Sequence, residues 1–409
     1  MQEHKDIDYP LLFLVLFLIL FWSIMISSVS VYDSYRITKR LVEAGSIAEP
    51  NNWRFILRNI LQAGIGLVAM VIAIKIPYLW WKKHIKTISI VVIIMLILVL
   101  VLGVRINWAR GWFDIPGIPF SLQPTEFLKL SIILSVAVFC TKYKNSLWNT
   151  AEWFIPFLWI VWFPSLLVLL QPDLGALLII IPVATSIFFI AGWNIRLILI
   201  LGCIGIIAWS LLYVMGRYTD PSDRWQFSYI YDRINTFVQS SRSAIENNTM
   251  HHQNKQALIA IGSGGFLGLW FGNSVQKYGY LPEPQGDFIF SIITEELGFL
   301  WAFTIICIYL IIIYRWFVIA LFCEENFGKF VAFGITVWIF WQMAVNISVN
   351  LSIFPNTGLT LPFVSYGGSS LLMMLLAVGI LLSISRTVPA SKKNIRTMIQ
   401  YYFLRKPRR

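Results

Sequence analysis

The sequence contains few charged residues and few residues of the kinds that bind metals or form disulfide bonds. Asp, Glu, Lys and Arg together make up 13% of the 409 residues, whereas about a quarter of an ordinary soluble domain is charged. The four cysteines include no CxxC pair, and the four histidines are scattered apart from His251 and His252 in a polar segment. Neither a disulfide framework nor a zinc site is indicated.

Apolar residues dominate the chain, at 58% of all residues. Apolar runs of about 18 to 20 residues, long enough to cross a hydrocarbon core of about 30 Å, recur from one end to the other. The alternating pattern of membrane β-strands is absent, and continuous runs such as ISIVVIIMLILVLVLG are typical of helices. We expect an all-α, polytopic integral membrane protein.

The apolar runs predict ten membrane-spanning helices in a single domain over residues 1–390. A loop at 216–287, between the seventh and eighth helices, is too long to be a mere connector. The first run lacks both a basic leader and a cleavage site, so we expect it to be retained. The predicted helices lie near residues 10–31, 56–78, 85–104, 126–141, 153–170, 173–191, 197–215, 288–314, 329–350 and 368–385.

Lys and Arg are distributed unequally between alternate loops. The positive-inside rule favours cytoplasmic termini and an external loop 216–287, because most basic residues outside that long loop then face the cytoplasm. The formal net charge is +12, and the densest basic cluster is KKNIRTMIQYYFLRKPRR. Attraction to anionic lipid explains this cytoplasmic tail, residues 391–409, more simply than nucleic-acid binding does. Docking of a partner protein is the alternative.

Charged residues also occur inside or beside the apolar runs. Each costs about 2.5 to 3.5 kcal/mol on insertion scales, so each implies a partner or a water-filled cavity. Glu126 and Lys129 are three residues apart and share a helix face. The alternative to a functional site is a set of ion pairs that only lock helices together, such as Lys129 with Glu295 or Arg110 with Asp173.

Asp287, in LPEPQGDFIFSII, lies at the boundary between a polar loop and an apolar run. Water and a lipid head group can both reach such a position, which favours a functional role. Asp287, Ser291 and Glu295 recur every four residues and are expected on one stripe of the helix. In the loop before them, Gly264, Gly268 and Gly272 also recur every four residues, which predicts close helix packing and not a dinucleotide fingerprint.

Five segments resemble, in order, the signatures of the shape, elongation, division and sporulation (SEDS) family, which includes FtsW, RodA and SpoVE. The resemblance is closer to the FtsW and SpoVE branch than to RodA. In most relatives His-Thr precedes the aspartate of the fourth segment, whereas this chain has Gln285 and Gly286 there. The segments are SLQPTEFLKLS, LLQPDLGALL, IGSGGFLGLWFGNSVQKYGYLPE, DFIFSIITEELGF and FPNTGLTLPFVSYGGSSLL.

The resemblance implies a peptidoglycan glycosyltransferase that polymerises lipid II at the outer face of the cytoplasmic membrane, for cell division or cell shape. The catalytic aspartate of the family falls on Asp287. The partner it implies is a class B penicillin-binding protein, together with other divisome or elongasome proteins, and nucleic acid is not expected. The substrate-binding residues that we expect on the external side are Lys129, Glu126, Arg110, Lys277, Glu295 and Ser369.

The chemistry requires a sugar hydroxyl to attack an anomeric carbon and expel undecaprenyl pyrophosphate. One general base suffices, because pyrophosphate is a good leaving group and needs no second carboxyl group as an acid. No metal cage is evident, so Mg²⁺ or Mn²⁺ would arrive with the pyrophosphate. Ser369 or Ser370 has the alternative role of a helix N-cap. The alternative functions are a lipid II flippase and a division scaffold.

Overall fold

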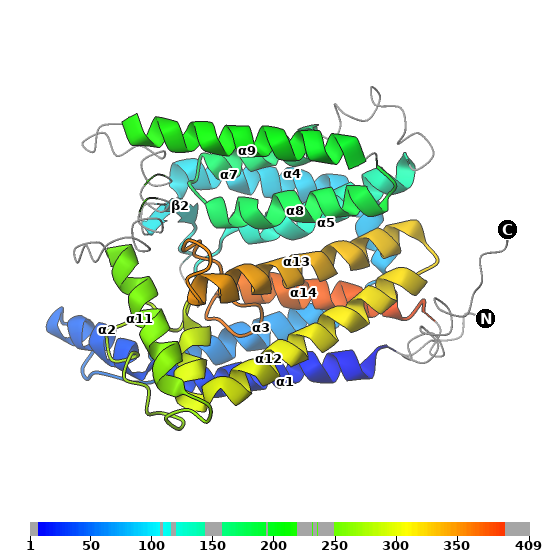
Figure 1. Cartoon of the computed structure of the whole chain (residues 1–409). Coiled ribbons are helices and arrows are strands. Elements are labelled where there is room, and N and C mark those ends of the chain that lie inside the picture. The colour runs from blue at the N-terminus through cyan, green and yellow to red at the C-terminus, as the bar shows by residue number, and fades with distance from the viewer. Residues whose placement is uncertain are drawn as a thin grey trace.

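The computed structural model describes residues 7–106, 109–115, 120–143, 158–193, 195–218, 231, 235 and 249–388. Long helices run side by side along one axis (Figure 1). Their bounds are α1 (Tyr9–Val29), α3 (Arg54–Lys75), α4 (Tyr78–Leu102), α5 (Pro124–Lys142), the π-helical turn η1 (Leu158–Trp162) continued by α7 (Phe163–Leu169), α8 (Leu174–Ile190), α9 (Ile195–Tyr218), α12 (Ile289–Phe322), α13 (Asn326–Asn350) and α14 (Gly368–Ser385).

Every predicted crossing overlaps one of these helices, although residues 153–157 of the fifth crossing lie outside the described part of the chain. The all-α membrane fold is confirmed for the described residues. Seven helices are long and apolar enough to cross a membrane: α1, α3, α4, α5, α12, α13 and α14. The count of ten crossings stays a prediction, because α8 and the segment Trp159–Leu169 are shorter apolar helices. The basic tail and residues 219–230, 232–234 and 236–248 of the long loop lie outside the described residues.

The elements that the apolar pattern did not predict lie together at one end of the bundle. They are helix α2 (Val31–Glu43), helix α11 (Thr249–Gly264) and a hairpin of strands β1 (Val104–Ile106) and β2 (Ala109–Trp112). Helix α1 begins and helix α14 ends at the opposite end (Figure 1). We call the end that carries α2, β2 and α11 the α11 end.

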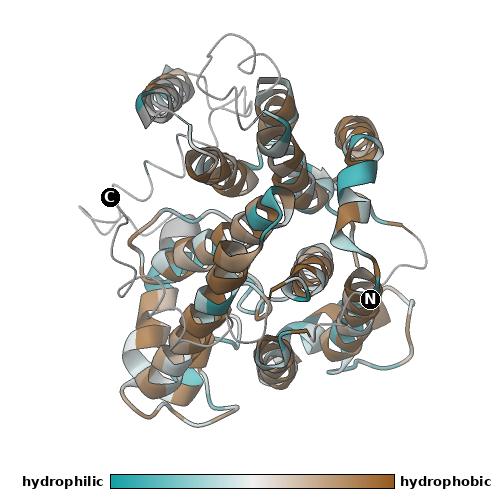
Figure 2. Cartoon of the chain, turned by 90° about the vertical axis from the view of Figure 1, so that its right-hand side faces the viewer, coloured by the Kyte–Doolittle hydropathy of each residue, from teal (hydrophilic) through white to brown (hydrophobic). Residues whose placement is uncertain are grey.

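The helices of the bundle are apolar on more than one face, as Figure 2 shows. In α1, Leu11, Val15 and Leu18 are buried against the bundle, whereas Phe13 and Leu20 are exposed. Apolar residues on an outer face are expected where that face meets lipid. Helices α5, α13 and α14 occupy the centre, since 78%, 67% and 89% of their apolar windows are buried.

Helix α12 is interrupted at Gly298, whose φ of 79° and ψ of 179° are not helical. The chain segment 265–269 supplies hydrogen bonds to the backbone groups freed by this break. The Glu295 carbonyl accepts from Leu269 N at 3.0 Å, and Phe299 N donates to the Gly265 carbonyl at 3.0 Å. The interruption is therefore bonded within the protein, as backbone polar groups inside a membrane must be.

Two of the three regularly spaced glycines permit this close approach. A Cβ on Gly264 would lie 2.0 Å from the Thr294 carbonyl oxygen, and one on Gly268 would lie 2.2 Å from that of Glu296. A Cβ on Gly272 would meet nothing within 4 Å. The predicted close packing is confirmed at Gly264 and Gly268 and is wrong for Gly272, which lies beyond the contact with α12.

The contact with α12 predicts that Gly264→Ala destabilises the protein. The added methyl group forces backbone movement, so we expect a loss of about 1–3 kcal/mol or more. Gly262→Ala is the matched control, because a Cβ there meets nothing within 4 Å and alanine favours a helix. Thermal unfolding in detergent measures both variants, and equal midpoints would contradict the packing argument.

Candidate functional site

The main chain of Asp287 is held at the α11 end by two buried amides of α13. The Asp287 carbonyl accepts hydrogen bonds from Asn346 Nδ2 and Asn350 Nδ2, each at 2.9 Å. Asn350 Oδ1 also accepts from Ser291 N at 3.1 Å and from Ser291 Oγ at 2.7 Å, so it caps the first turn of α12 from outside that helix. Asp287 itself is partly exposed.

The two asparagines were missed in the sequence, although a signal for them is present. Gln342, Asn346 and Asn350 recur every four residues in α13 and therefore share one face. Gln342 Nε2 donates to the Thr360 carbonyl at 2.9 Å, and Gln342 Oε1 lies 3.5 Å from Lys129 Nζ. This amide stripe connects the Asp287 segment with the buried charges of α5.

Lys129 and Glu126 form a buried ion pair within α5. The Lys129 Nζ to Glu126 Oε1 distance is 2.7 Å, and the side chains are 2% and 8% exposed. Glu126 Oε2 is buried without a hydrogen-bond partner. The alternative pairing of Lys129 with Glu295 is wrong, because three-residue spacing within one helix already brings Lys129 and Glu126 together.

Glu295 binds the loop that precedes Asp287. Its carboxylate accepts from Ser274 Oγ at 2.5 Å and from Val275 N at 3.0 Å. Asp287 lies before the first turn of α12, because the helix begins at Ile289. The predicted stripe through Asp287, Ser291 and Glu295 is therefore only partly helical.

Lys277 and Glu296 form a second buried ion pair, which joins the same loop to α12 and α1. Lys277 Nζ lies 2.8 Å from Glu296 Oε1 and donates to Ser28 Oγ at 2.9 Å. It also donates to the Gly272 carbonyl at 2.6 Å. Glu296, which the sequence analysis had not assigned, is the partner that balances the charge of Lys277.

Arg110 and Asp173 lie in separate hydrogen-bond networks, so the alternative pairing of these two residues is wrong. Arg110 Nη1 donates to the Leu100 carbonyl at 3.1 Å and so provides a hydrogen-bond donor for a carbonyl group in the last turn of α4. Asp173 Oδ1 accepts from Ala176 N at 3.0 Å and caps α8.

Ser369 joins α14 to the segment before α5. Its Oγ donates to the Ser121 carbonyl at 2.8 Å and accepts from Gln123 N at 3.0 Å. The N-cap of α14 is Gly367, so the alternative N-cap role of Ser369 or Ser370 is wrong. Ser370 Oγ lies 3.1 Å from Thr360 Oγ1 instead.

Polar residues of α2, of α3 and of the segment before α14 lie beside the segment that precedes Asp287, and the sequence analysis missed them. Tyr366 N donates to the Gln285 carbonyl at 2.8 Å. Burial raises the pKa of the Tyr366 hydroxyl, and the hydrogen bond from Gln62 and the positive charge of the exposed Arg58 oppose that rise. Burial also raises the pKa of Asp33, and the Arg36 guanidinium and the Gln285 side chain oppose that rise.

The α11 end therefore combines a partly exposed carboxylate, an exposed guanidinium and a rigid support of buried amides. A carboxylate held in this way can accept a proton from a hydroxyl, and a nearby cation can stabilise an anionic leaving group. Among the described residues, no three His, Cys, Asp or Glu side chains are grouped as metal ligands.

Sequence comparisons match nearly the whole chain. The sequence model of the FtsW, RodA and SpoVE family, described as cell cycle proteins, matches residues 9–389. Stage V sporulation protein E of Bacillus subtilis is 35% identical over 334 residues, which cover 81% of this chain and 87% of that protein. The probable peptidoglycan glycosyltransferase FtsW of Thioalkalivibrio sp. is 33% identical over 403 residues, covering 96% of this chain and 93% of the relative.

Solved structures share the fold. Rod shape determining protein RodA of Thermus thermophilus has a TM-score of 0.64 and 25% identity, covering 93% of this chain and 97% of that one. An aspartate-to-alanine mutant of RodA gives the same values. A chain from a peptidoglycan synthase complex that coordinates polymerization and crosslinking has a TM-score of 0.69 at 24% identity and covers 93% of this chain and 98% of its own.

The Lys277–Glu296 pair predicts a non-additive effect on stability. Lys277→Met leaves the Glu296 carboxylate buried and unpaired, at a cost of about 3–5 kcal/mol. Adding Glu296→Gln removes that charge and should recover part of the loss. Thermal unfolding of the parent, both single variants and the double variant completes a double-mutant cycle, and strictly additive effects would contradict the pairing.

Proposed function

The chain belongs to the FtsW, RodA and SpoVE family of cell cycle proteins, and from this premise we propose that it is a peptidoglycan glycosyltransferase that polymerises lipid II with Asp287 as general base. The observation that carries the assignment of Asp287 is its position. It is a partly exposed carboxylate at the α11 end, and α13 amides fix its main chain.

In the proposed reaction, a sugar hydroxyl of one substrate attacks the anomeric carbon of a lipid-linked glycan. The new glycosidic bond forms as the bond to pyrophosphate breaks, and the anomeric centre is inverted. Asp287 accepts the hydroxyl proton, a contribution typically of about 10² to 10⁴-fold. Undecaprenyl pyrophosphate departs with the electron pair of the broken bond and needs no general acid.

The leaving pyrophosphate requires positive charge. Arg58 is exposed and its positive charge acts on the Tyr366 hydroxyl, beside the Asp287 segment, which supports a role for Arg58 at the pyrophosphate. Lys129 and Lys277 are each paired with a buried glutamate. We assign Lys129, Lys277 and Glu295 to the buried wall of the site. Arg110 and Ser369 are assigned to supporting positions at its edge. Mg²⁺ or Mn²⁺ would accompany the pyrophosphate as part of the substrate.

The orientation that fits this function has both termini in the cytoplasm and the α11 end outside. The distribution of Lys and Arg supports it, as does the position of the start of α1 and the end of α14 opposite α11 (Figure 1). A class B penicillin-binding protein is the proposed partner. Support comes from the similarity to a chain of a peptidoglycan synthase complex.

Replacing the proposed base tests the assignment. Asp287→Asn keeps the shape of the side chain, but an amide cannot take up the proton at neutral pH. We expect lipid II polymerisation by purified protein to fall by at least about 100-fold, with the thermal midpoint unchanged. Glu283→Gln, an exposed acid in the same loop, should retain activity.

The same comparison separates the alternative functions. A flippase would still move lipid II after Asp287→Asn, and a scaffold would still recruit its partner. Polymerisation by the Asn variant at more than about a tenth of the normal rate would rule out Asp287 as the base, since loss of a general base allows much less.

Asn350 is a positioning residue in this proposal, and its loss should act on turnover. Asn350→Ala removes the bonds to the Asp287 carbonyl and to Ser291. A misplacement of about 1 Å can cost about 100-fold, so we expect kcat to fall about 10 to 100-fold with KM changed less than about threefold. Asn273→Ala is the control, because among the described residues that exposed amide donates a hydrogen bond only to the nearby Leu269 carbonyl. Unchanged kcat per folded molecule would contradict the role.

A further inference from the structure

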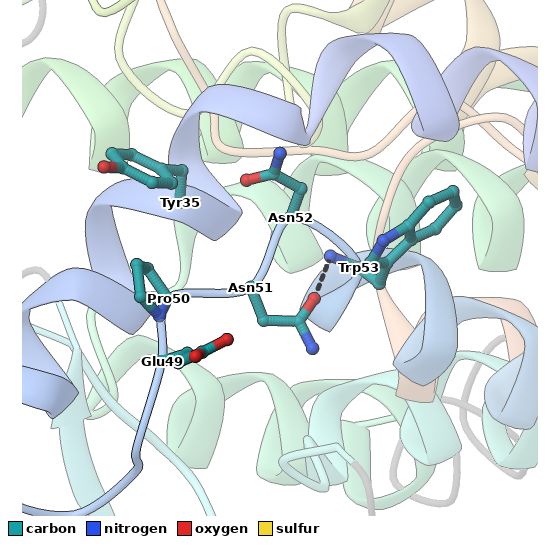
Figure 3. Close-up of a pocket in the computed structure, with 6 residues that line it drawn as sticks. All are labelled: Tyr35, Glu49, Pro50, Asn51, Asn52 and Trp53. Atoms are coloured by element: carbon teal, nitrogen blue, oxygen red, sulfur yellow. Dashed lines mark hydrogen bonds between the residues drawn. The ribbon is translucent and has the colours of Figure 1, made fainter.

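A hollow of about 350 Å³, which Asp287 does not line, lies at the junction of α2 and α3 (Figure 3). It is lined by Tyr35 of α2 and by five consecutive residues of the connection to α3, which are Glu49, Pro50, Asn51, Asn52 and Trp53. Its volume is in the range of small-ligand sites, which is about 300 to 1,000 Å³. The rings of Tyr35 and Trp53 flank it from two sides (Figure 3).

Part-buried and exposed hydrogen bonds hold the hollow in shape. The Thr38 hydroxyl, 2% exposed, accepts from Asn51 N at 2.8 Å and lies 3.0 Å from the Asn51 carbonyl. Trp53 N donates to Asn51 Oδ1 at 2.5 Å, and Phe55 N donates to Ser34 Oγ at 3.4 Å. The connection is therefore fixed to α2 before any ligand arrives, which lowers the entropic cost of binding.

The lining selects a class of ligand. None of the six lining residues is Lys or Arg, and Glu49 contributes a carboxylate, so an anion such as pyrophosphate is disfavoured. The amides and the carboxylate equally disfavour a polyprenyl tail, because they would lose hydration without gaining partners. A neutral molecule rich in hydroxyl groups suits them, since amides both donate and accept hydrogen bonds.

The two aromatic residues point to a sugar in particular. Trp53 is 61% exposed and Tyr35 is 44% exposed. The face of a pyranose ring presents C–H groups that pack on an aromatic surface, while its hydroxyl and acetamido groups remain free for polar contacts. We propose that the hollow is a saccharide subsite that holds N-acetylated sugar residues of the growing glycan strand.

The subsite is joined to the reaction site through α2. The side chain of Gln285, two residues before Asp287, interacts with Asp33, which lies two residues before Tyr35. Trp53 also directly precedes α3, the helix that carries Arg58. A strand held here would stay near the enzyme between additions. This inference rests on the proposed function and assigns the subsite to processivity, not to bond formation.

The test compares product length with initial rate. Trp53→Ala and Asn52→Ala should each shorten the glycan strands at least about threefold, while the initial rate of lipid II consumption changes less than about twofold. Tyr9→Ala is the control, an aromatic residue that is 60% exposed at the start of α1, the opposite end of the bundle. Strands of normal length from the Asn52 variant would overturn the subsite and leave Trp53 as an anchor at the membrane surface.

A direct binding measurement tests the saccharide subsite independently of the proposed glycosyltransferase activity. The N-acetylglucosamine tetramer should bind the parent protein in detergent, measured by saturation-transfer NMR, and should lose at least about tenfold in affinity in Trp53→Ala. This measurement needs no turnover, so an inactive parent that binds the tetramer would refute the glycosyltransferase assignment alone. If the parent is active but does not bind the tetramer, the subsite alone is refuted. The same follows if the active parent and Trp53→Ala bind the tetramer with equal affinity.

Discussion

The arrangement of the α11 end depends on one constraint, which is that polar groups inside an apolar bundle must find partners within the protein. Several of these pairings join segments that are distant in sequence. Lys277, Glu296 and Ser28 join a loop, α12 and α1. Asn350 joins the end of α13 to the start of α12. The position of Asp287 follows from these pairings, because its main chain lies between them.

Sequence patterns over a few residues predicted the helices and part of the site. The rest of the site depends on contacts between segments that are distant in sequence. Apolar runs are sufficient to indicate spanning helices, and three-residue spacing is sufficient to place Glu126 beside Lys129. Spacing cannot show that Lys277 meets Glu296, because their contact requires the loop to fold back on α12. The break at Gly298 was equally invisible, since a glycine in an apolar run is compatible with an unbroken helix until segment 265–269 approaches it.

The segment that contains Gln285 and Gly286, directly before Asp287, is held by hydrogen bonds to main-chain carbonyl groups, so it can accept different side chains. Most relatives have His-Thr where this chain has Gln285 and Gly286. The Gln285 carbonyl accepts from Tyr366 N, and the Asp287 carbonyl accepts from two asparagines. Those bonds do not depend on the side chains at 285 and 286. The main chain at Asp287 can therefore keep its place without histidine.

The distribution of charged residues along the bundle distinguishes an enzyme from a flippase. Alternating access requires polar groups along a path through the membrane. Here no Asp, Glu, Lys or Arg occurs between Lys129 and Lys142 in α5, or between Glu296 and Arg315 in α12. The broken helix that a transporter would use is closed at Gly298 by backbone bonds to segment 265–269. Moving a pyrophosphate through that apolar interval would leave its charges unpaired at a cost of several kcal/mol each. Chemistry confined to the α11 end avoids this cost, because the head group stays at the surface and only the polyprenyl tail needs to enter the apolar part of the bundle.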